Sequence, residues 1–360
     1  MGEDARQVAR DGARAGGPAE RLGRGLRSIW VVTDGRPGNE NPARALAEGL
    51  VAAVNGPTDD PAAADVQIDI KRVALRPWSA ALPAPLWTFG GARAGGWPFT
   101  ALEDRGAALA APYPDLVIGA GRRSAPFVLA IKRLSGGGAR AVQLLDPRLD
   151  PARFDLVITP AHDDLQGPGV LSTIGSLHNA GPAALHGVSD PRLSGLKRPL
   201  IGMLVGGPSR AAQMTPEDAD RWMDALRPAL AAGASVAATP SRRTPKAVAA
   251  RVETEIRSHG GFYWRGDGEN PYRALLAVAD ILVATGDSVN MASEAAGAGK
   301  PLFIAPVTKL SPKLERFHAA LEAGGHAQPL PARLDLTRLG PPPRLLDDRA
   351  AAVARILTFF

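Results

Sequence analysis

Short apolar runs alternate along the chain with longer segments in which apolar residues recur at helical spacing. Each short run is bounded by Gly, Pro or Asp, which is typical of a buried β-strand. The predicted strands are Ser28–Thr33, Val66–Lys71, Asp115–Ile118, Arg140–Leu144, Leu156–Thr159, Leu200–Val205, Ala234–Ala238, Gly261–Trp264, Asp280–Val283 and Leu302–Ile304. The predicted helices include Asn41–Asn55, Ala125–Leu134, Pro216–Ala232, Lys246–His259 and Tyr272–Val278.

Strands that alternate with helices form parallel sheets covered by helices on both faces. The polar, Gly- and Pro-rich stretch Gly181–Arg198 separates two such series and has the composition of a linker. The pattern therefore predicts an α/β protein with two Rossmann-like parallel-sheet domains facing a central cleft. Ligands of such sheets bind outside the carboxyl ends of the strands, so the loops that directly follow strands are the candidate sites.

The predicted parts of the chain follow from these breaks in the pattern. We expect a disordered tail at 1–27, an N-terminal domain at 28–185, a linker at 186–199, a C-terminal domain at 200–330, and an extension with a final helix at 331–360. The tail is rich in Ala, Gly and Arg but has no apolar core, so we do not expect a secretory signal there. The final helix, Asp347–Phe360, is expected to pack on the N-terminal domain.

Composition limits the class of function. Of the 360 residues 45% are hydrophobic and 22% charged, as in an ordinary soluble protein, and the absence of cysteine excludes disulfides and thiol catalysis. The net charge is +6, but the arginines are scattered and do not form a basic stripe interleaved with aromatics, which argues against nucleic-acid binding. Anionic small molecules or an anionic membrane surface fit this charge better. No apolar run reaches the roughly 18 residues of a membrane span, so we expect a cytoplasmic protein, with a peripheral position on the inner membrane face as an extension of that expectation.

The loop and helix after the strand at 280–283 contain an unexplained carboxylate. Asp287 or Ser288 could cap a helix over about 289–298. Glu294 lies six residues after Ser288, beyond the three-residue spacing of a capping box, so it does not serve the cap. Glu294 is therefore either a solvated helix residue or part of a ligand site that includes Ser288 and Asn290.

Two further strand-end loops in the same half carry groups suited to a phosphate. Gly206 and Gly207 leave their N–H groups open to an anion, in a loop that continues to Ser209. The next strand ends in "TPSRRTP", where Ser241, Arg242 and Arg243 could clamp a diphosphate, although paired arginines are also common on surfaces. We expect the base of a nucleotide to lie near "GDGENPY", which contributes Asn270 and Tyr272.

The N-terminal half offers candidates for the acceptor side and for acid–base chemistry. The acceptor-side candidates are Gly35, Asn39, Arg122 and Arg123, which follow predicted strands. His162-Asp163 includes the only strand-end histidine of this half, so a general base is predicted there or at Asp34. A structural role for His162 is an equal alternative. No His, Asp or Glu set has metal-ligand spacing, and no metal is predicted.

Two other stretches of this half have more than one interpretation. "GAGRRS" at 119–124 is similar to a dinucleotide fingerprint, but it follows the third strand of the series and no hydride-transfer pair accompanies it. The stretch 75–99 contains Trp78, Trp87 and Trp97 with flanking arginines and no regular period. Packing under the N-terminal sheet is the favoured interpretation, and a membrane interface is the alternative, because no regular element is predicted that would carry three buried rings.

Several of these motifs also occur together in a known family. "DGRPGNENPA", "PDLVIGAGRRSAP", "TPAHDD", "GPSR", "SRRTP", "GENPY" and "GDSVNMASEAAGAGKP" together resemble the bacterial members of the mitochondrial fission "elongated mitochondria" family. That family is similar to the GT-B glycosyltransferases. In the peptidoglycan N-acetylglucosaminyltransferase of that group, a similar unit of strand, Ser-rich turn, helix and Glu binds the diphosphate and ribose of the nucleotide-sugar. The resemblance implies that Ser288, Asn290 and Glu294 bind the donor, with Gly206–Ser209 beside its diphosphate.

The expected function follows from this resemblance and from the loops. It is a metal-independent transfer of a sugar from a nucleotide-sugar, of the UDP type, to an acceptor that could be lipid-linked, with no cofactor required. The alternatives are a non-catalytic adaptor at a membrane-associated assembly and a nucleoside-diphosphate-sugar epimerase. Because the family resemblance carries no assigned reaction, all three stay open here.

Overall fold

The computed structural model describes residues 25–56, 66–83, 86–87, 91–340 and 343–360. Most of the predicted tail, residues 1–24, lies outside this range. Two compact units are present: one comprises the chain up to Val157 together with Ala350–Phe360, and the other comprises Ile158–Arg349.

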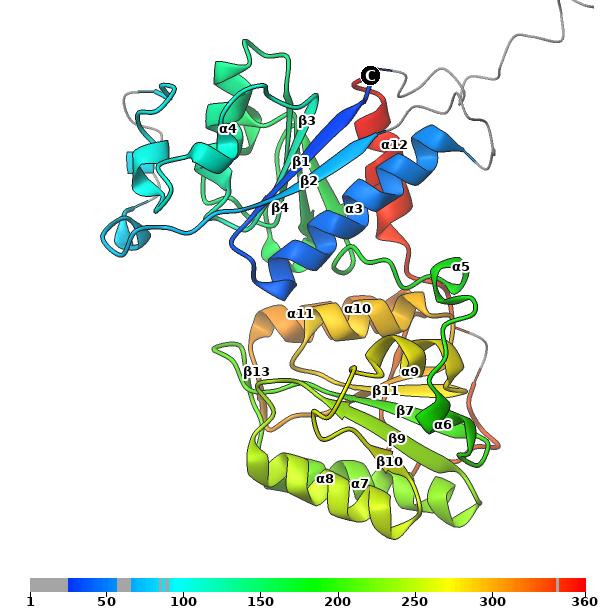
Figure 1. Ribbon diagram of the computed structural model, residues 1–360. Helices are drawn as coiled ribbons and strands as arrows, with labels where there is room; N and C mark the ends of the chain where they lie inside the picture. The colour runs from blue at the N-terminus through cyan, green and yellow to red at the C-terminus, as the bar shows by residue number, and fades with distance from the viewer. Residues whose placement is uncertain (1–24, 57–65, 84–85, 88–90, 341–342) are drawn as a thin grey trace, which may run out of the picture. The chain divides into compact units, whose positions relative to one another are not determined.

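The first sheet has the strand order β2-β1-β3-β4-β5-β6 (Figure 1). Its elements are β1 (Ser28–Thr33), α3 (Pro37–Asn55), β2 (Gln67–Arg72), β3 (Leu116–Ala120), α4 (Ala125–Leu134), β4 (Arg140–Leu144), β5 (Leu156–Pro160) and β6 (Val170–Thr173). The pairs β1–β2, β1–β3 and β3–β4 are all parallel; for example, Ile29 of β1 is in register with Leu116 of β3. The helices α3 and α4 cover opposite faces, as right-handed crossovers in both directions from the centre require (Figure 1).

Short 3₁₀ turns connect these elements, at η1 (Ser79–Ala81), η3 (Phe99–Ala101), η4 (Ala107–Leu109), η5 (Pro151–Arg153) and η6 (Ala161–Asp163). The last helix, α12 (Asp348–Leu357), returns to this unit from Ala350 onward. There, Phe359 lies under the Arg140 guanidinium at 5.9 Å, which supports the expectation that the C-terminal helix packs on the N-terminal part.

The second sheet has the strand order β10-β9-β7-β11-β12-β14. Its elements are β7 (Leu200–Val205), α7 (Pro216–Ala231), β9 (Ser235–Pro240), α8 (Lys246–Ser258), β10 (Phe262–Tyr263), α9 (Tyr272–Val278), β11 (Ile281–Thr285), α10 (Val289–Gly297), β12 (Leu302–Ala305), α11 (Pro312–Ala323) and β14 (Gln328–Pro329). A small antiparallel pair, β8 (Ala212–Gln213) with β13 (Lys309–Leu310), lies outside it. In Figure 1, α7 and α8 cover one face, and α9, α10 and α11 the other.

The alternating pattern therefore becomes two parallel α/β sheets of the GT-B-like class, and each predicted strand is present within two residues of its predicted ends. All residues of β7 and β11 are buried, which is why they read as continuous apolar runs in the sequence. The helix α11 and the strand β6 were not predicted from the sequence.

The stretch predicted as a linker contains two one-turn helices, α5 (Pro182–Leu185) and α6 (Pro191–Ser194). Leu185 and Leu193 from these turns are 6% and 4% exposed and belong to the hydrophobic core of the second unit. Because each turn contributes only one apolar anchor, its sequence shows no period. The linker and the domain limits predicted around it stay predictions.

The Trp-rich stretch packs without a regular element. The Trp87 ring stacks on Trp97 at 5.3 Å and meets the fully buried Phe127 edge-on at 5.8 Å, and Trp87 is only 9% exposed. Trp78 alone of the three is largely exposed, at 55%. The inference that three rings without a period could not be buried is wrong for Trp87, because stacking on Trp97 and the edge contact with Phe127 of α4 fix the ring in an irregular loop.

Candidate functional site

Three loops of the second unit emerge at one edge of its sheet. The order β9-β7-β11 places the loops that follow Pro240, Val205 and Thr285 beside one another, since the carboxyl ends of parallel strands share an edge. These are the loops that the sequence predicts for a donor.

The paired glycines after β7 are bonded to the loop after β11. The Gly206 N–H donates to Thr285 Oγ1 and the Gly207 N–H donates to Asp287 Oδ2, each at 2.8 Å. The Thr285 hydroxyl donates in turn to Asp287 Oδ1 at 2.6 Å. The prediction that these two N–H groups face an anion is therefore wrong for this structure, because protein side chains already occupy them.

The same glycines allow close packing between loops. A Cβ on Gly206 would lie 2.2 Å from Asp287 Oδ2, and a Cβ on Gly207 would lie 2.4 Å from the backbone carbonyl of Arg243. Burial of the Asp287 carboxyl raises its pKa, while the hydrogen bonds from Thr285 and Gly207 and the charge of Arg243 oppose that rise. The loops after β7, β9 and β11 thus form one tightly packed unit around a buried carboxyl.

Ser241 organises the loop after β9. Its N–H donates to Thr244 Oγ1 at 2.9 Å, and its Oγ accepts from the Arg243 N–H at 3.1 Å. The Arg243 guanidinium lies 4.0 Å from Asp287 Oδ2 with more than half of its side chain exposed. Arg242 is also exposed and has no hydrogen-bond or ion-pair partner among the described residues. Both guanidinium groups are accessible to an anionic ligand.

Helix α10 begins at the loop after β11. Ser288 is its N-cap, since Ser288 Oγ accepts from the Met291 N–H at 3.4 Å. Of the two predicted caps, Ser288 is therefore used, and Asp287 bonds the glycine loop instead. Asn290 lies half-buried in the first turn, and its side chain makes no hydrogen bond within the described part of the chain.

Glu294 is half-buried and has a specific partner. The Tyr272 hydroxyl donates to Glu294 Oε2. Burial raises the pKa of the Glu294 carboxyl, against the Tyr272 hydrogen bond and the charge of Arg273, and burial likewise raises the pKa of the Tyr272 hydroxyl. Glu294 is therefore not a freely solvated helix residue, which was the structural alternative.

Asn270 connects the two parts of this site. Its Oδ1 accepts from the Thr239 hydroxyl at 2.8 Å and from the Tyr272 N–H at 3.0 Å. The structure thus brings Asn270, Tyr272 and Glu294 together. Ser209 stays apart, because it is exposed and its Oγ accepts only from the Ala211 N–H of its own turn, at 3.0 Å.

His162 and Asp163 lie against α11. The His162 ring is 6% exposed, meets Phe317 edge-on at 5.4 Å, and its Nδ1 has no hydrogen-bond partner among the described residues. Burial lowers the pKa of His162 to about 4, and the positive charges of Lys313 and Arg316 add to this effect against the opposing charge of Asp163. Asp163 accepts from the Thr159 hydroxyl at 3.1 Å.

Asp163 also forms an ion pair with Lys313, and the Arg316 guanidinium donates to the His162 carbonyl oxygen at 2.9 Å. This cluster therefore has the contacts of a structural attachment of α11 to η6. A catalytic role for His162 or Asp163 stays a prediction.

Asp34 lies in the other unit, at the end of β1. Its Oδ1 accepts from Asn39 Nδ2 at 2.9 Å, and its Oδ2 lies 3.7 Å from the Arg123 guanidinium. Gly35 has φ +72°, a conformation that favours glycine and turns the chain into α3. The structure thus unites the acceptor-side candidates Gly35, Asn39 and Arg123 around Asp34.

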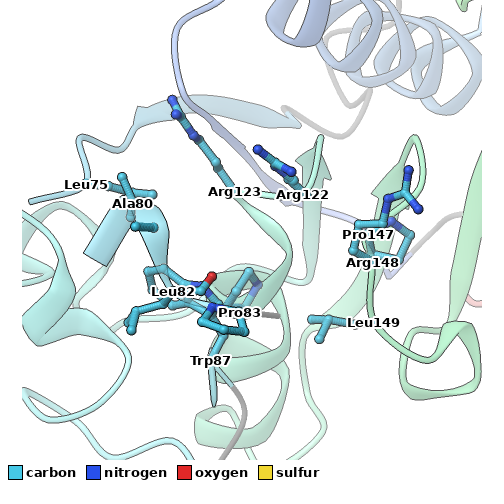
Figure 2. A pocket seen from close by; sticks show the side chains of 12 residues that line it. Leu75, Ala80, Leu82, Pro83, Trp87, Arg122, Arg123, Pro147, Arg148 and Leu149 are labelled. Carbon is cyan, nitrogen blue, oxygen red and sulfur yellow. The ribbon is translucent and has the colours of Figure 1, made fainter. Parts of the chain in front are cut away.

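A cavity of about 420 Å³ opens beside these residues in the first unit. Figure 2 shows Arg122, Arg123 and Arg148 around one part of it and Leu82, Pro83 and Trp87 around another. Its complete lining is Leu75, Ala80, Ala81, Leu82, Pro83, Trp87, Arg122, Arg123, Pro126, Pro147, Arg148 and Leu149.

Sequence reasoning found Arg122 and Arg123 but missed Arg148 and the apolar wall. Arg148 follows β4, so the rule that located the other strand-end loops could also have found it. The wall at Leu82 and Pro83 belongs to an irregular loop and carries no period that would have placed it in the sequence.

The described residues contain neither a cluster of metal-ligating side chains nor a helix suited to cross a membrane. No group of three or more His, Cys, Asp or Glu side chains there is arranged to hold a metal ion. Among the same residues, no helix combines the length and the apolar content needed to cross a membrane.

Comparison with known proteins now places the chain. The family model for mitochondrial fission ELM1 matches residues 37–359. The chain belongs to this family. It is 30% identical over 270 residues to the mitochondrial fission protein ELM1 of Arabidopsis thaliana, covering 68% of the chain and 63% of that relative. It is 28% identical over 233 residues to the uncharacterized protein RP120 of Rickettsia prowazekii (strain Madrid E), covering 53% of the chain and 64% of that relative. The chain thus spans somewhat under two thirds of the length of these relatives.

Solved structures show the same fold at low sequence identity. One is a Listeria monocytogenes protein provisionally assigned as a UDP-N-acetylglucosamine 2-epimerase, with a TM-score of 0.54 and 14% identity, covering 86% of this chain and 85% of that one. Another is the S. aureus MnaA structure with UDP, with a TM-score of 0.50 and 12% identity, covering 93% and 97%. At these identities the likeness establishes the GT-B-like fold and nothing about the reaction.

Proposed function

We propose that this ELM1-family protein binds a nucleotide-sugar, of the UDP type, through the second unit and transfers the sugar, without a metal, to an acceptor bound by the first unit. The observation that carries the proposal is the set of Glu294, Tyr272 and Asn270 beside three strand-end loops. A half-buried carboxylate at this place suits the hydroxyls of a ribose, and the fold is shared with a protein solved with UDP.

In this proposal, different residues bind different parts of the ligand. Glu294 Oε2 is occupied by Tyr272, so a ribose hydroxyl would donate to Oε1. The exposed guanidinium groups of Arg242 and Arg243 would bind the diphosphate and stabilise the charge that develops on it as it leaves. Because Gly206 and Gly207 already donate to side chains, the arginines and the N-terminus of α10 are left as the anion-binding groups.

Transfer would break the bond between the sugar's anomeric carbon and the diphosphate and form a bond from that carbon to an acceptor oxygen. The diphosphate leaves with the electron pair, and the acceptor group, an alcohol or a phosphate OH, loses its proton to a base. Asp34 is the proposed base, since its carboxylate follows β1 at the carboxyl end of the sheet and is held in place by Asn39.

Calorimetric titration with UDP-N-acetylglucosamine tests the donor site. Glu294→Ala is expected to weaken binding by about 1–3 kcal/mol, because a buried acceptor of ribose hydrogen bonds is lost. Glu322→Ala, an exposed acid on α11, is the matched control and should leave binding unchanged. Equal affinities of wild type and Glu294→Ala, with both folded, would remove Glu294 from the site.

A non-catalytic adaptor is the second candidate. It is favoured by the burial of His162 and the ion pair of Asp163, which leave this predicted pair without the accessibility of a general base. An assay of UDP release from UDP-N-acetylglucosamine across acceptors separates the candidates. Release that Asp34→Asn abolishes while donor binding persists supports transfer, whereas binding without release by the wild type supports the adaptor.

An epimerase is the third candidate, and the same reaction mixture tests it. Conversion of the UDP-sugar to a stereoisomer in the absence of acceptor, followed by NMR, would select epimerisation over both other candidates.

A further inference from the structure

The cavity of the first unit is amphipathic. Its guanidinium groups come from the loops after β3 and β4, whereas its apolar wall includes Leu82, Pro83, Trp87 and Leu149 (Figure 2). At about 420 Å³ it falls within the roughly 300–1,000 Å³ of small-molecule sites. Such a division suits a ligand with one charged end and one apolar end.

The charged end of the cavity has more positive than negative groups. Arg123 lies 3.7 Å from Asp34 and Arg148 lies 3.1 Å from Asp146, so two of the three guanidinium groups are paired. Arg122 is exposed and has no ion-pair partner in the described part of the chain. The three lining arginines outnumber the two carboxylates paired with them by one. The unpaired positive charge is that of Arg122, whose planar guanidinium suits a phosphate.

The apolar end is built on fixed side chains. The Trp87 ring centroid lies 5.3 Å from that of Trp97 and 5.8 Å from that of Phe127, and Trp87 lines the cavity. Pro83 and Pro126 add rigid apolar surface. A wall that is ordered before binding costs little entropy when an aliphatic group replaces water against it.

From these observations we infer that the cavity binds an anionic amphiphile, namely a phosphate or diphosphate ester of an aliphatic alcohol. The phosphate contacts Arg122 and the neighbouring arginines, and the chain lies against Trp87, Leu82 and Pro83. The inference deepens the proposed function, because it assigns the chemical class of the acceptor, and this acceptor role rests on the proposed function. Binding of the amphiphile to the cavity does not depend on the proposed function.

Titration calorimetry with n-octyl phosphate below its micelle concentration tests the inference. One molecule should bind each chain, whereas inorganic phosphate and 1-octanol, which each match one end of the cavity, should bind at least tenfold more weakly. Arg122→Ala should weaken octyl phosphate binding at least fivefold, and Ala80→Trp, which places a ring in the cavity, should do the same. Arg153→Ala removes an exposed arginine of the same unit outside the cavity and should change nothing.

Several results would overturn the inference. Inorganic phosphate binding as tightly as octyl phosphate would mean a simple anion site, and an equal loss in Arg153→Ala would mean attraction by overall charge. Sedimentation with phosphatidylglycerol vesicles without binding of octyl phosphate would mean a membrane surface interaction in place of a cavity ligand. Glu294→Ala should keep full octyl phosphate binding, so failure of the UDP-sugar experiment leaves this inference standing and the reverse also holds.

Discussion

The loops at the carboxyl ends of the two sheets differ in how many of their polar groups are already paired. In the second unit, the polar groups of these loops are bonded to one another: Gly207 to Asp287, Tyr272 to Glu294, and Thr239 to Asn270. In the first unit, the loops after β3 and β4 leave Arg122 unpaired within the described residues, beside an open cavity. A ligand of the second unit must therefore use the groups that these hydrogen bonds leave free, such as Glu294 Oε1 and Arg242, whereas a ligand of the first unit can contact Arg122 at the cavity.

The histidines are also distributed unequally between the two units. All six histidines of the sequence lie between positions 162 and 326, within the second unit. Two of them, His162 and His178, are buried with a lowered pKa, whereas the first unit contains no histidine. We therefore expect the units to respond differently to truncation, acid and crowding of their loops.

The largest effect is expected in the wall of the first unit. Trp87→Ala should lower the free energy of unfolding by about 3–5 kcal/mol, because a buried aromatic side chain is replaced by a cavity. Trp78→Ala is the matched control, because that ring is 55% exposed, and should cost less than about 1 kcal/mol. Chemical denaturation of both variants measures the difference, and equal losses would contradict the packing role assigned to Trp87.

A fall in pH should destabilise the second unit. The pKa of His162 and of His178 is about 4 in the folded protein, mainly because of burial, against about 6.5 when unfolded. Between these values the unfolded chain binds the protons, so stability is full above pH 6.5 and is lost as the pH falls to about 4. Each histidine contributes up to about 3 kcal/mol to this loss.

Hydrogen exchange at pH 7 and pH 5 should locate that acid effect. Protection of β7 and β11 should fall more than protection of β1 and β3, and His178→Gln should reduce the difference. Equal losses of protection in both units would show that carboxylates, and not the histidines, set the acid response.

A smaller effect is expected when a methyl group is added between the hydrogen-bonded loops of the second unit. Gly207→Ala should destabilise by about 1–3 kcal/mol, because its Cβ would lie 2.4 Å from the Arg243 carbonyl. Gly195→Ala, where a Cβ meets nothing within 4 Å, is the control and should stay within about 0.5 kcal/mol of wild type. A neutral Gly207→Ala would mean that the loops after β7 and β9 separate easily and that the contrast between the units is weaker than the hydrogen bonds suggest.

The candidate site was only partly predictable from the sequence. The loops that directly follow strands could be located, because parallel sheets bring their carboxyl ends to one edge, and Glu294 could be selected because capping did not account for it. The state of the groups in those loops could not be read in this way. Whether Gly206 and Gly207 are open or bonded depends on Thr285 and Asp287, which lie some eighty positions further along the chain.

The sequence by itself determined the α/β class, the position of nearly every strand and the family, because local periodicity and long ordered motifs are properties of the chain itself. Only the tertiary structure decided that Trp87 is packed without a regular element, that Tyr272 bonds Glu294, and that arginines from two loops meet an apolar wall. These are contacts between segments distant in sequence, each with its own local conformation, and no periodicity encodes them. Their physical basis is the burial and pairing of side chains that become neighbours only after the sheets have formed.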